Sequence, residues 1–233
     1  MWMVWMWTRA WAEPTAAVEL LQTHHDMRAL PSAPNLPASA YDEALRGSVP
    51  TGLIDVPGHK ARVAWGLAVV DQPIDRYWAA VNDDRNKISY TKLEHLELLE
   101  GDYCSAKRLT FQYLGVTMLT DRWWVVDQIH NGPLASATGG KVREMSWKSR
   151  PSYADRLPES AKAWASKGME LPFTEGAWTL VDMGDGRTLV QYYAWSDPGG
   201  SVPARVASSF AEGGISDTIA SMAALAKKGP SCL

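Results

Sequence analysis

The stretch that decides the fold is YYAWSDPGGSVPARVASSF, residues 192–210. Aromatic and β-branched residues before Asp197 are typical of a strand, and the residues after Pro203 are typical of a helix. Between them, the DPGG sequence supplies residues that favour turns, and Pro203 suits the first turn of a helix. The pattern predicts that a last strand stops abruptly and that the chain reverses into a terminal helix.

The predicted terminal helix, residues 203–228, carries a broad apolar stripe. The stripe consists of Val206, Phe210, Ile215, Ile219, Met222, Leu225 and Ala226. A sheet with one apolar face must bury that face against another element, and this helix is long enough to cover it. We therefore expect the helix to fold back across the concave face of a sheet, with a bend at Gly213-Gly214.

The elements before this helix are mainly strands. A β-rich run at 59–71 leads into a helical run at 72–84, whose apolar residues recur at helical spacing. Strand-like runs follow at 90–100, 105–115, 121–130, 141–150, 176–183 and 187–196. Glycine-containing turns of hairpin length separate most of them, so we expect an antiparallel meander in an α+β fold.

This arrangement resembles a known family. The DPGGSVPARV junction after TLVQYY, together with TDRWWV at 120–125, is similar to START lipid-transfer domains of the helix-grip (SRPBCC) superfamily, which includes the birch-pollen-allergen-like proteins. The resemblance covers residues 51–230 and implies a curved antiparallel sheet gripping a long C-terminal helix around a hydrophobic cavity. The chain departs from the family in having Ala207-Ser208-Ser209 where an asparagine is often found.

A second departure is the stretch 151–175, which looks like an insertion. Its composition predicts a helix at about residues 158–167. We expect that helix to cover the mouth of the cavity that the resemblance implies.

Two neighbouring strands each place polar and large apolar residues on one face. These residues are Arg108, Thr110 and Gln112 on one strand, and Arg122, Trp124, Val126 and Gln128 on the next. Either the two arginines lie on a solvated face, or this face lines a cavity with apolar walls and a few polar groups.

The resemblance implies that the cavity holds a lipid, sterol-like or other hydrophobic small molecule, which the protein binds and transfers. The expected ligand-binding residues are Trp65, Arg108, Gln112, Arg122, Trp124, Trp178, Tyr192, Phe210 and Ile219. Loop 115–121 corresponds to a family loop at the cavity mouth. We expect its Met118 and Leu119 to contact membranes transiently, the alternative being that both fold inward.

Two other classes of function remain open: a cyclase or hydrolase-type enzyme using the same pocket, and an interaction module whose cavity is filled by side chains. The sequence contains no nucleophile elbow, zinc-protease, Walker or dinucleotide motif. His59, His95 and His130 occur singly, and His24-His25 would diverge by about 100° on a helix. We therefore expect no catalytic residues, no metal and no cofactor.

Length and composition indicate one domain, since 233 residues with 46% hydrophobic residues can bury a sizeable core. A formal net charge of -3 gives no general basic field. That charge argues against nucleic acid as a partner. We expect a monomer.

The N-terminal stretch MWMVWMWTRAWA ends in Ala10-Trp11-Ala12, a pattern typical of a signal-peptidase site. We interpret residues 1–12 as a truncated signal peptide and expect a periplasmic or secreted protein. The alternative is a tryptophan-rich start of a cytoplasmic protein. Residues 13–50 are expected to form a helix and a proline-rich linker.

The two cysteines, Cys104 and Cys232, lie far apart in the sequence. They form no CxxC or Cys/His spacing, so they imply neither a zinc site nor a disulfide framework. The cysteines alone leave the redox compartment open.

Overall fold

A computed structural model of the protein describes residues 14–117, 119–200 and 204–233, without side-chain detail at 14, 15, 152 and 204–213. The described strands form one nine-stranded sheet. They are β1 (Thr51–Ile54), β2 (Val63–Val70), β3 (Leu93–Glu100), β4 (Lys107–Leu114), β5 (Asp121–His130), β6 (Val142–Ser149), β7 (Gly168–Glu170), β8 (Phe173–Asp182) and β9 (Thr188–Asp197).

The strand order is β1-β2-β9-β8-β6-β5-β4-β3, and every pair along it is antiparallel. From β3 to β6, and again from β8 to β9, consecutive strands are neighbours, which confirms the predicted meander. β2 pairs with β9, so the first and last long strands lie together. The short β7 was not predicted; it runs parallel to the start of β5, beyond the point where β6 stops pairing.

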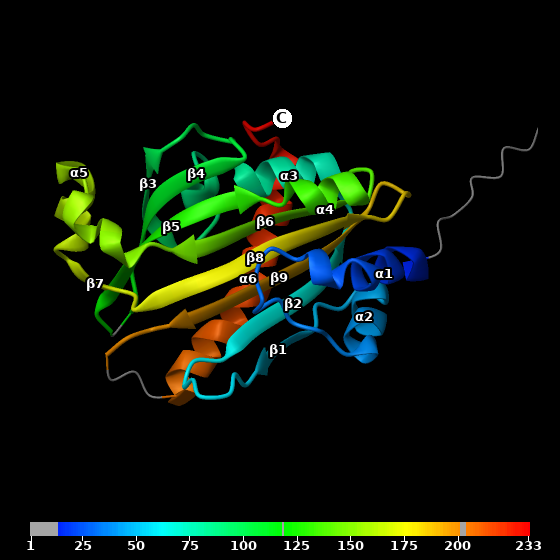
Figure 1. The fold of residues 1–233 in the computed structure, drawn as a ribbon, viewed down its shortest axis with the longest axis horizontal. Helices are drawn as coiled ribbons and strands as arrows, with labels where there is room; N and C mark the ends of the chain where they lie inside the picture. The colour runs from blue at the N-terminus through cyan, green and yellow to red at the C-terminus, as the bar shows by residue number, and fades with distance from the viewer. Residues whose placement is uncertain (1–13, 118, 201–203) are drawn as a thin grey trace, which may run out of the picture.

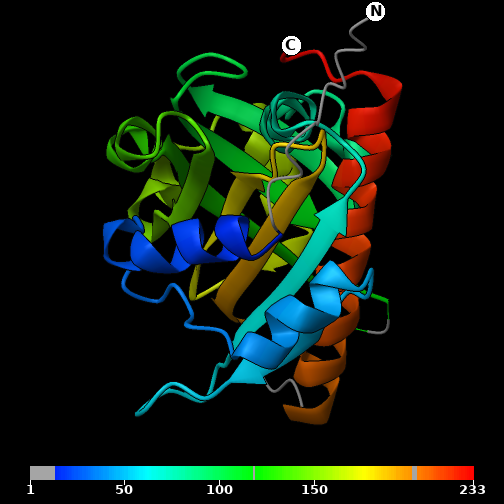
Figure 2. The same ribbon diagram turned by 90° about the vertical axis from the view of Figure 1, so that its right-hand side faces the viewer.

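Helices cover both faces of this sheet (Figures 1 and 2). They are α1 (Pro14–Thr23), α2 (Ala38–Leu45), α3 (Ile74–Asn82), α4 (Gly132–Ala137), α5 (Glu159–Ala165) and α6 (Ala204–Lys228), with 3-10 turns η1 (His25–Met27), η2 (Lys87–Ser89) and η3 (Pro151–Arg156). We call the face under α6 the inner face and the face under α1 the outer face. None of the described helices has the length and apolar character needed to cross a membrane.

The reversal after β9 is held by local and distant contacts. Asp197 Oδ1 accepts a hydrogen bond from the Gly199 amide at 2.9 Å, and Gly199 and Gly200 both have φ of +64°, a conformation that glycine adopts without strain. The Arg122 guanidinium, from β5, donates to the carbonyl of Pro198 at 2.6 Å and to that of Gly199 at 3.5 Å. The predicted strand stop is confirmed, while Pro203 lies outside the described residues.

The described half of α6 packs tightly on the inner face. Ile215, Ile219 and Met222 are buried, together with Leu225 and Ala226, as the predicted stripe requires. Val206, Phe210 and Gly213 lie outside the residues whose side chains are described. The close approach depends on Gly66 of β2, because a Cβ atom there would lie 2.4 Å from Cγ2 of Ile215.

The segment expected to be a helix and a linker is part of the folded core. α1 and α2 bury Leu21 and Tyr41 in one cluster with Trp65 and Tyr193 of the outer face. Between these helices, the Arg28 guanidinium forms a buried ion pair with Glu144 of β6. Residues 14–50 therefore pack on the sheet instead of separating the sheet from the N-terminus.

The helix predicted at 158–167 is present as α5, but its expected position over the cavity mouth is wrong. Ala161 of α5 is buried against Leu109, Phe111 and Tyr113 of β4. These three side chains point away from Gln112, because side chains alternate along a strand. α5 therefore covers the outer face of β4.

The structure contains a disulfide between Cys104 and Cys232, with 5.5 Å between their Cα atoms. The spacing of the two cysteines implied no disulfide, and that expectation is wrong. The cysteines are separated by 128 residues, and only the fold brings the β3–β4 turn next to the chain that follows α6.

Candidate functional site

The register between β4 and β5 brings the predicted polar residues onto one face. Arg108 pairs with Gln128, Thr110 with Val126, and Gln112 with Trp124. Arg108 and Arg122 are only 1% and 7% exposed, so the alternative that they lie on a solvated face is wrong.

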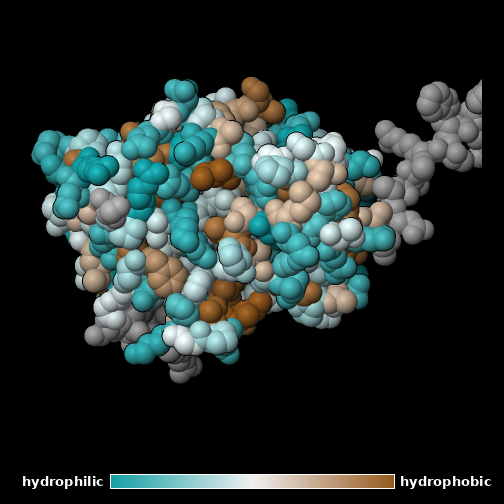
Figure 3. Space-filling model, in the orientation of Figure 1, coloured by the Kyte–Doolittle hydropathy of each residue, from teal (hydrophilic) through white to brown (hydrophobic). Residues whose placement is uncertain are grey.

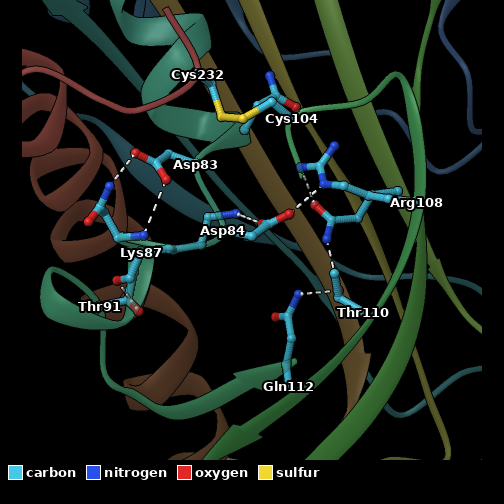
Figure 4. Close-up of polar contacts among 12 residues, drawn as sticks. Asp83, Asp84, Lys87, Thr91, Cys104, Arg108, Thr110, Gln112 and Cys232 are labelled. Carbon is cyan, nitrogen blue, oxygen red and sulfur yellow. Dashed lines mark hydrogen bonds and ion pairs between the residues drawn. A yellow bond between two sulfur atoms is a disulfide. The ribbon is translucent and has the colours of Figure 1, made fainter. Parts of the chain in front are cut away.

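One end of the inner face is polar and centred on an ion pair (Figure 4). Asp84, which follows α3, accepts hydrogen bonds from the Arg108 guanidinium and, at 2.8 Å, from the Lys87 ammonium. Burial disfavours the ionised carboxyl, but Lys87 and Arg108 outweigh it and lower the pKa of Asp84. The side chains of Arg108 and Asp84 are both 0% exposed, so the two charges form a fully buried ion pair.

A chain of hydrogen bonds runs from this ion pair toward the middle of the sheet (Figure 4). Arg108 donates to Gln128 Oε1 at 2.9 Å, and Gln128 Nε2 donates to Thr110 Oγ1 at 2.8 Å. Gln112 Nε2 donates to the same hydroxyl oxygen at 3.1 Å. Gln112 ends the chain, and its side chain is half-buried, whereas Arg108, Gln128 and Thr110 are buried.

His130 lies at the same end. Asn82 Nδ2 donates to the Trp78 carbonyl at 2.9 Å, so its Oδ1 faces His130 Nε2, 2.8 Å away, and that nitrogen carries the proton. Burial, with a smaller contribution from Arg108, lowers the pKa of His130 to about 4. The imidazole is therefore neutral at neutral pH.

The other part of the inner face is an aromatic wall. Trp178 and Tyr192 stack with ring centroids 4.2 Å apart, and Trp147 lies 5.6 Å from Tyr192. Trp147 can lie over β8 because residue 176 is glycine; a Cβ atom there would be 2.4 Å from Trp147 Cζ2.

Several side chains of the inner face are only partly buried. Burial raises the pKa of the Tyr192 phenol above its usual range. Yet its side chain keeps accessible surface, as do those of Trp124, Trp147 and Gln112 on the same face. Large apolar side chains of the inner face therefore keep partial exposure next to the helix that covers this face.

The structure gathers most of the predicted site residues. Gln112, Trp124, Trp178 and Tyr192 share the inner face, which Ile219 of α6 also contacts. Arg108 is buried at the polar end of the same face.

Of the other predicted residues, Arg122 and Trp65 have different surroundings, and Phe210 is not tested. Arg122 binds the carbonyls of the β9–α6 junction, so its guanidinium holds the helix. Trp65 lies on the outer face beside α1 and α2, because its neighbours Ala64 and Gly66 take the inner positions of β2. Phe210 lies outside the residues whose side chains are described.

Sequence reasoning missed Trp147 and the ion pair of Asp84 and Lys87. Trp147 lies two residues after Met145, so both side chains are on the same face of β6. The two-residue period of a strand could therefore have predicted that Trp147 faces inward. The partnership between Asp84 and Arg108 had no comparable signal, since 24 residues separate them.

The outer face carries a separate groove of about 630 Å³. Its floor is a row across four strands, Val63, Trp195, Glu175 and Lys148, and its walls are residues 31–35 and 54–57. Figure 3 shows this face, with apolar side chains gathered beside the N-terminal segment. Because its floor residues point away from the inner face, the groove is not part of the site described above.

No family model matches the sequence, and no curated protein matches it. Several solved structures do match the structure of this chain. A STAR-related lipid transfer protein from Xanthomonas axonopodis aligns with a TM-score of 0.62 at 16% identity, over 77% of this chain and 93% of that one. Human STARD10 aligns with a TM-score of 0.65 at 12% identity, over 89% of this chain and 78% of that one.

An aromatase/cyclase, Zhui from Streptomyces sp. R1128, aligns with a TM-score of 0.51 at 11% identity, over 72% of this chain and 94% of that one. Identities this low establish a shared fold alone. The chain therefore has the helix-grip fold of START domains, as the resemblance of its sequence implied.

The lowered pKa of His130 predicts a pH-dependent stability. Between about pH 6.5 and pH 4 the unfolded chain binds a proton at this residue and the folded protein does not, so stability falls as the pH drops through that window. His130→Gln keeps a donor toward Asn82 and removes the titration. Denaturant unfolding at about pH 7 and pH 4.5 should show a smaller loss for the variant. Equal losses would contradict the assignment.

Proposed function

We propose that the protein binds an uncharged lipid or similar hydrophobic small molecule between the inner face and α6, and carries it. The observation that supports this most directly is the aromatic wall under α6, where Trp178 stacks on Tyr192 and Tyr192 keeps partial exposure. Trp124 and Trp147 extend the same wall. Apolar walls with a few polar groups are the usual composition of a small-molecule site.

The polar end favours an uncharged ligand. Arg108 and Lys87 are balanced by Asp84 and its neighbour Asp83, which accepts hydrogen bonds from Ser231 and Asn86. An ionised head group would therefore be buried there without a counter-ion, which is costly. Gln112 Oε1 has no partner among the described residues and can accept a hydrogen bond from a ligand hydroxyl or amide.

The energetics allow useful affinity without a covalent step. Burying roughly 400 Å² of apolar ligand surface at ~25 cal/mol/Å² contributes about 10 kcal/mol. Association costs several kcal/mol of this, which leaves about micromolar affinity or better.

An enzyme of the cyclase or hydrolase type is the second candidate, since the Streptomyces aromatase/cyclase has the same fold. The polar end favours binding over catalysis. Asp84 and Arg108 are paired with each other, and a histidine with a pKa of about 4 is a weak base. A bound ligand recovered chemically unchanged after incubation would favour the carrier; conversion would favour the enzyme.

Binding can be tested with Nile red, an uncharged hydrophobic dye. Gln112→Trp should fill the cavity and weaken binding by about tenfold or more. Lys107→Trp places the same side chain at the exposed start of β4 and should bind like the wild type. Fluorescence titration measures both, with circular dichroism to confirm folding.

The anionic dye 1-anilinonaphthalene-8-sulfonate should bind more weakly than Nile red, because the polar end offers no unpaired cation. Absence of Nile red binding, or equal binding by both tryptophan variants, would contradict a site between the inner face and α6.

Transfer between membranes through the loop 115–121 is a further part of the proposal. Leu119 is half-buried, with its amide bonded to the Val116 carbonyl at 3.1 Å, and Met118 lies outside the described residues. Replacing both with Asp should slow liposome-to-liposome transfer of a fluorescent lipid with little change in melting temperature. Val49→Asp, at another exposed apolar position, is the matched control. A large loss of stability would show instead that these residues belong to the core.

An oxidising compartment outside the cytoplasm is proposed for the protein. The Cys104–Cys232 disulfide supports it, because such bonds persist chiefly in secreted and periplasmic proteins. The expected signal remnant at 1–12 lies outside the described residues. N-terminal sequencing of the protein from its own organism should begin at Glu13, and an intact Met1 would count against the signal peptide.

A further inference from the structure

The disulfide joins two segments that also contact the polar end of the site. Cys104 lies in the turn between β3 and β4, with φ of +65°, and Cys232 follows α6. Both cysteines are half-buried. In Figure 4 the bond lies beside the network of Asp83, Asp84 and Arg108.

The residue before Cys232 is bonded to this network. Ser231 donates through its amide to Asp83 Oδ2 at 2.7 Å and through its hydroxyl to Asp83 Oδ1 at 2.8 Å. Asp83 directly precedes Asp84, the partner of Arg108.

The residue after Cys104 is bonded to the same network from the other side. Arg108 Nη1 donates to the Ser105 carbonyl at 3.0 Å, while its Nε pairs with Asp84. The disulfide, Ser231, Asp83-Asp84, Arg108 and Ser105 thus form a closed ring of covalent and hydrogen bonds. Opening the disulfide breaks that ring next to the arginine from which the hydrogen bonds to Gln112 begin.

We propose that the Cys104–Cys232 disulfide is a redox switch for the ligand site, which rests on the function proposed above. In the oxidised protein the ring holds Arg108, and through Gln128 and Thr110 it holds Gln112 in its ligand-facing position. A dithiol reductant transfers two electrons and two protons: the S–S bond breaks, two cysteine thiols form, and the dithiol becomes a disulfide. The reduced protein binds ligand more weakly.

The rest of the fold does not depend on this bond. Met222, Leu225 and Ala226 keep α6 packed on the sheet, and the Tyr77 hydroxyl donates to the Ile219 carbonyl at 3.0 Å. The chain after Gly229 is joined to the turn after α3 by hydrogen bonds of Ser231 with Asp83 and Asn86. Reduction therefore loosens the turn at Cys104 and the C-terminal residues, while the sheet and α6 stay folded.

The test compares Nile red affinity of the full-length protein before and after reduction by dithiothreitol, with thiol titration to confirm that both cysteines are released. Reduction should weaken binding on the order of tenfold, and reoxidation should restore it. The variant with Cys104→Ser and Cys232→Ser should bind weakly with or without reductant. Unchanged circular dichroism separates this effect from unfolding.

A second variant keeps the disulfide and removes one link of the ring. Asp83→Asn retains most of the size of the side chain but weakens its bonds to Ser231, so the difference in affinity between oxidised and reduced protein should shrink. An undiminished difference would overturn the route through Asp83.

A measurement without ligand separates failure of the switch from failure of the proposed function. The NMR signal of Arg108 Nε–H in the free protein should shift on reduction, because its surroundings change. An unmoved signal, or equal Nile red affinity in both folded forms, would overturn the switch and leave the binding function intact. A shifted signal in a protein that binds Nile red in neither form would overturn the proposed function, and with it the effect on affinity.

Discussion

The arrangement of this protein depends on how closely α6 can approach the sheet. Gly66 presents bare backbone to Ile215, where any Cβ atom would come within 2.4 Å of the isoleucine methyl group. Closely packed interiors tolerate such overlap poorly. The helix is further held where it leaves β9, by Arg122 and the two left-handed glycines, and beyond its C-terminus, by Ser231 and the disulfide. These contacts set the position of the helix over the aromatic wall and the polar end.

Buried ion pairs lie on both faces of the sheet and have different consequences. Asp84–Arg108 on the inner face neutralises the polar end, and the hydrogen bonds that start from this pair end at the uncharged amide of Gln112. Arg28–Glu144 on the outer face joins the N-terminal segment to β6. Buried pairs add little net stability, but removing one partner leaves an uncompensated charge, so each pair strongly constrains where its segments can lie.

The site combines an aromatic wall with a polar end that lies beside the disulfide. Trp147, Trp178 and Tyr192 stand on neighbouring strands; Trp178 stacks on Tyr192, and Trp147 contacts Tyr192 at a tilt, which limits their movement. The turn at Cys104 and the residues after Gly229 are joined by the disulfide, and Ser231 adds two hydrogen bonds to Asp83.

The sequence by itself determined the order of the long strands with α3 and α6, the stop after Asp197, and which residues share a face along β4 and β5. These features follow from local turn chemistry and from the two-residue period of a strand, both of which act over a few residues. Only the tertiary structure decided which face of the sheet these elements cover. Trp65 and α5 lie on the outer face, and Arg122 binds the carbonyls of the β9–α6 junction. It alone also decided the Cys104–Cys232 and Asp84–Arg108 pairings. Such contacts depend on strand register and on chain reversal over long separations, and no local pattern encodes either.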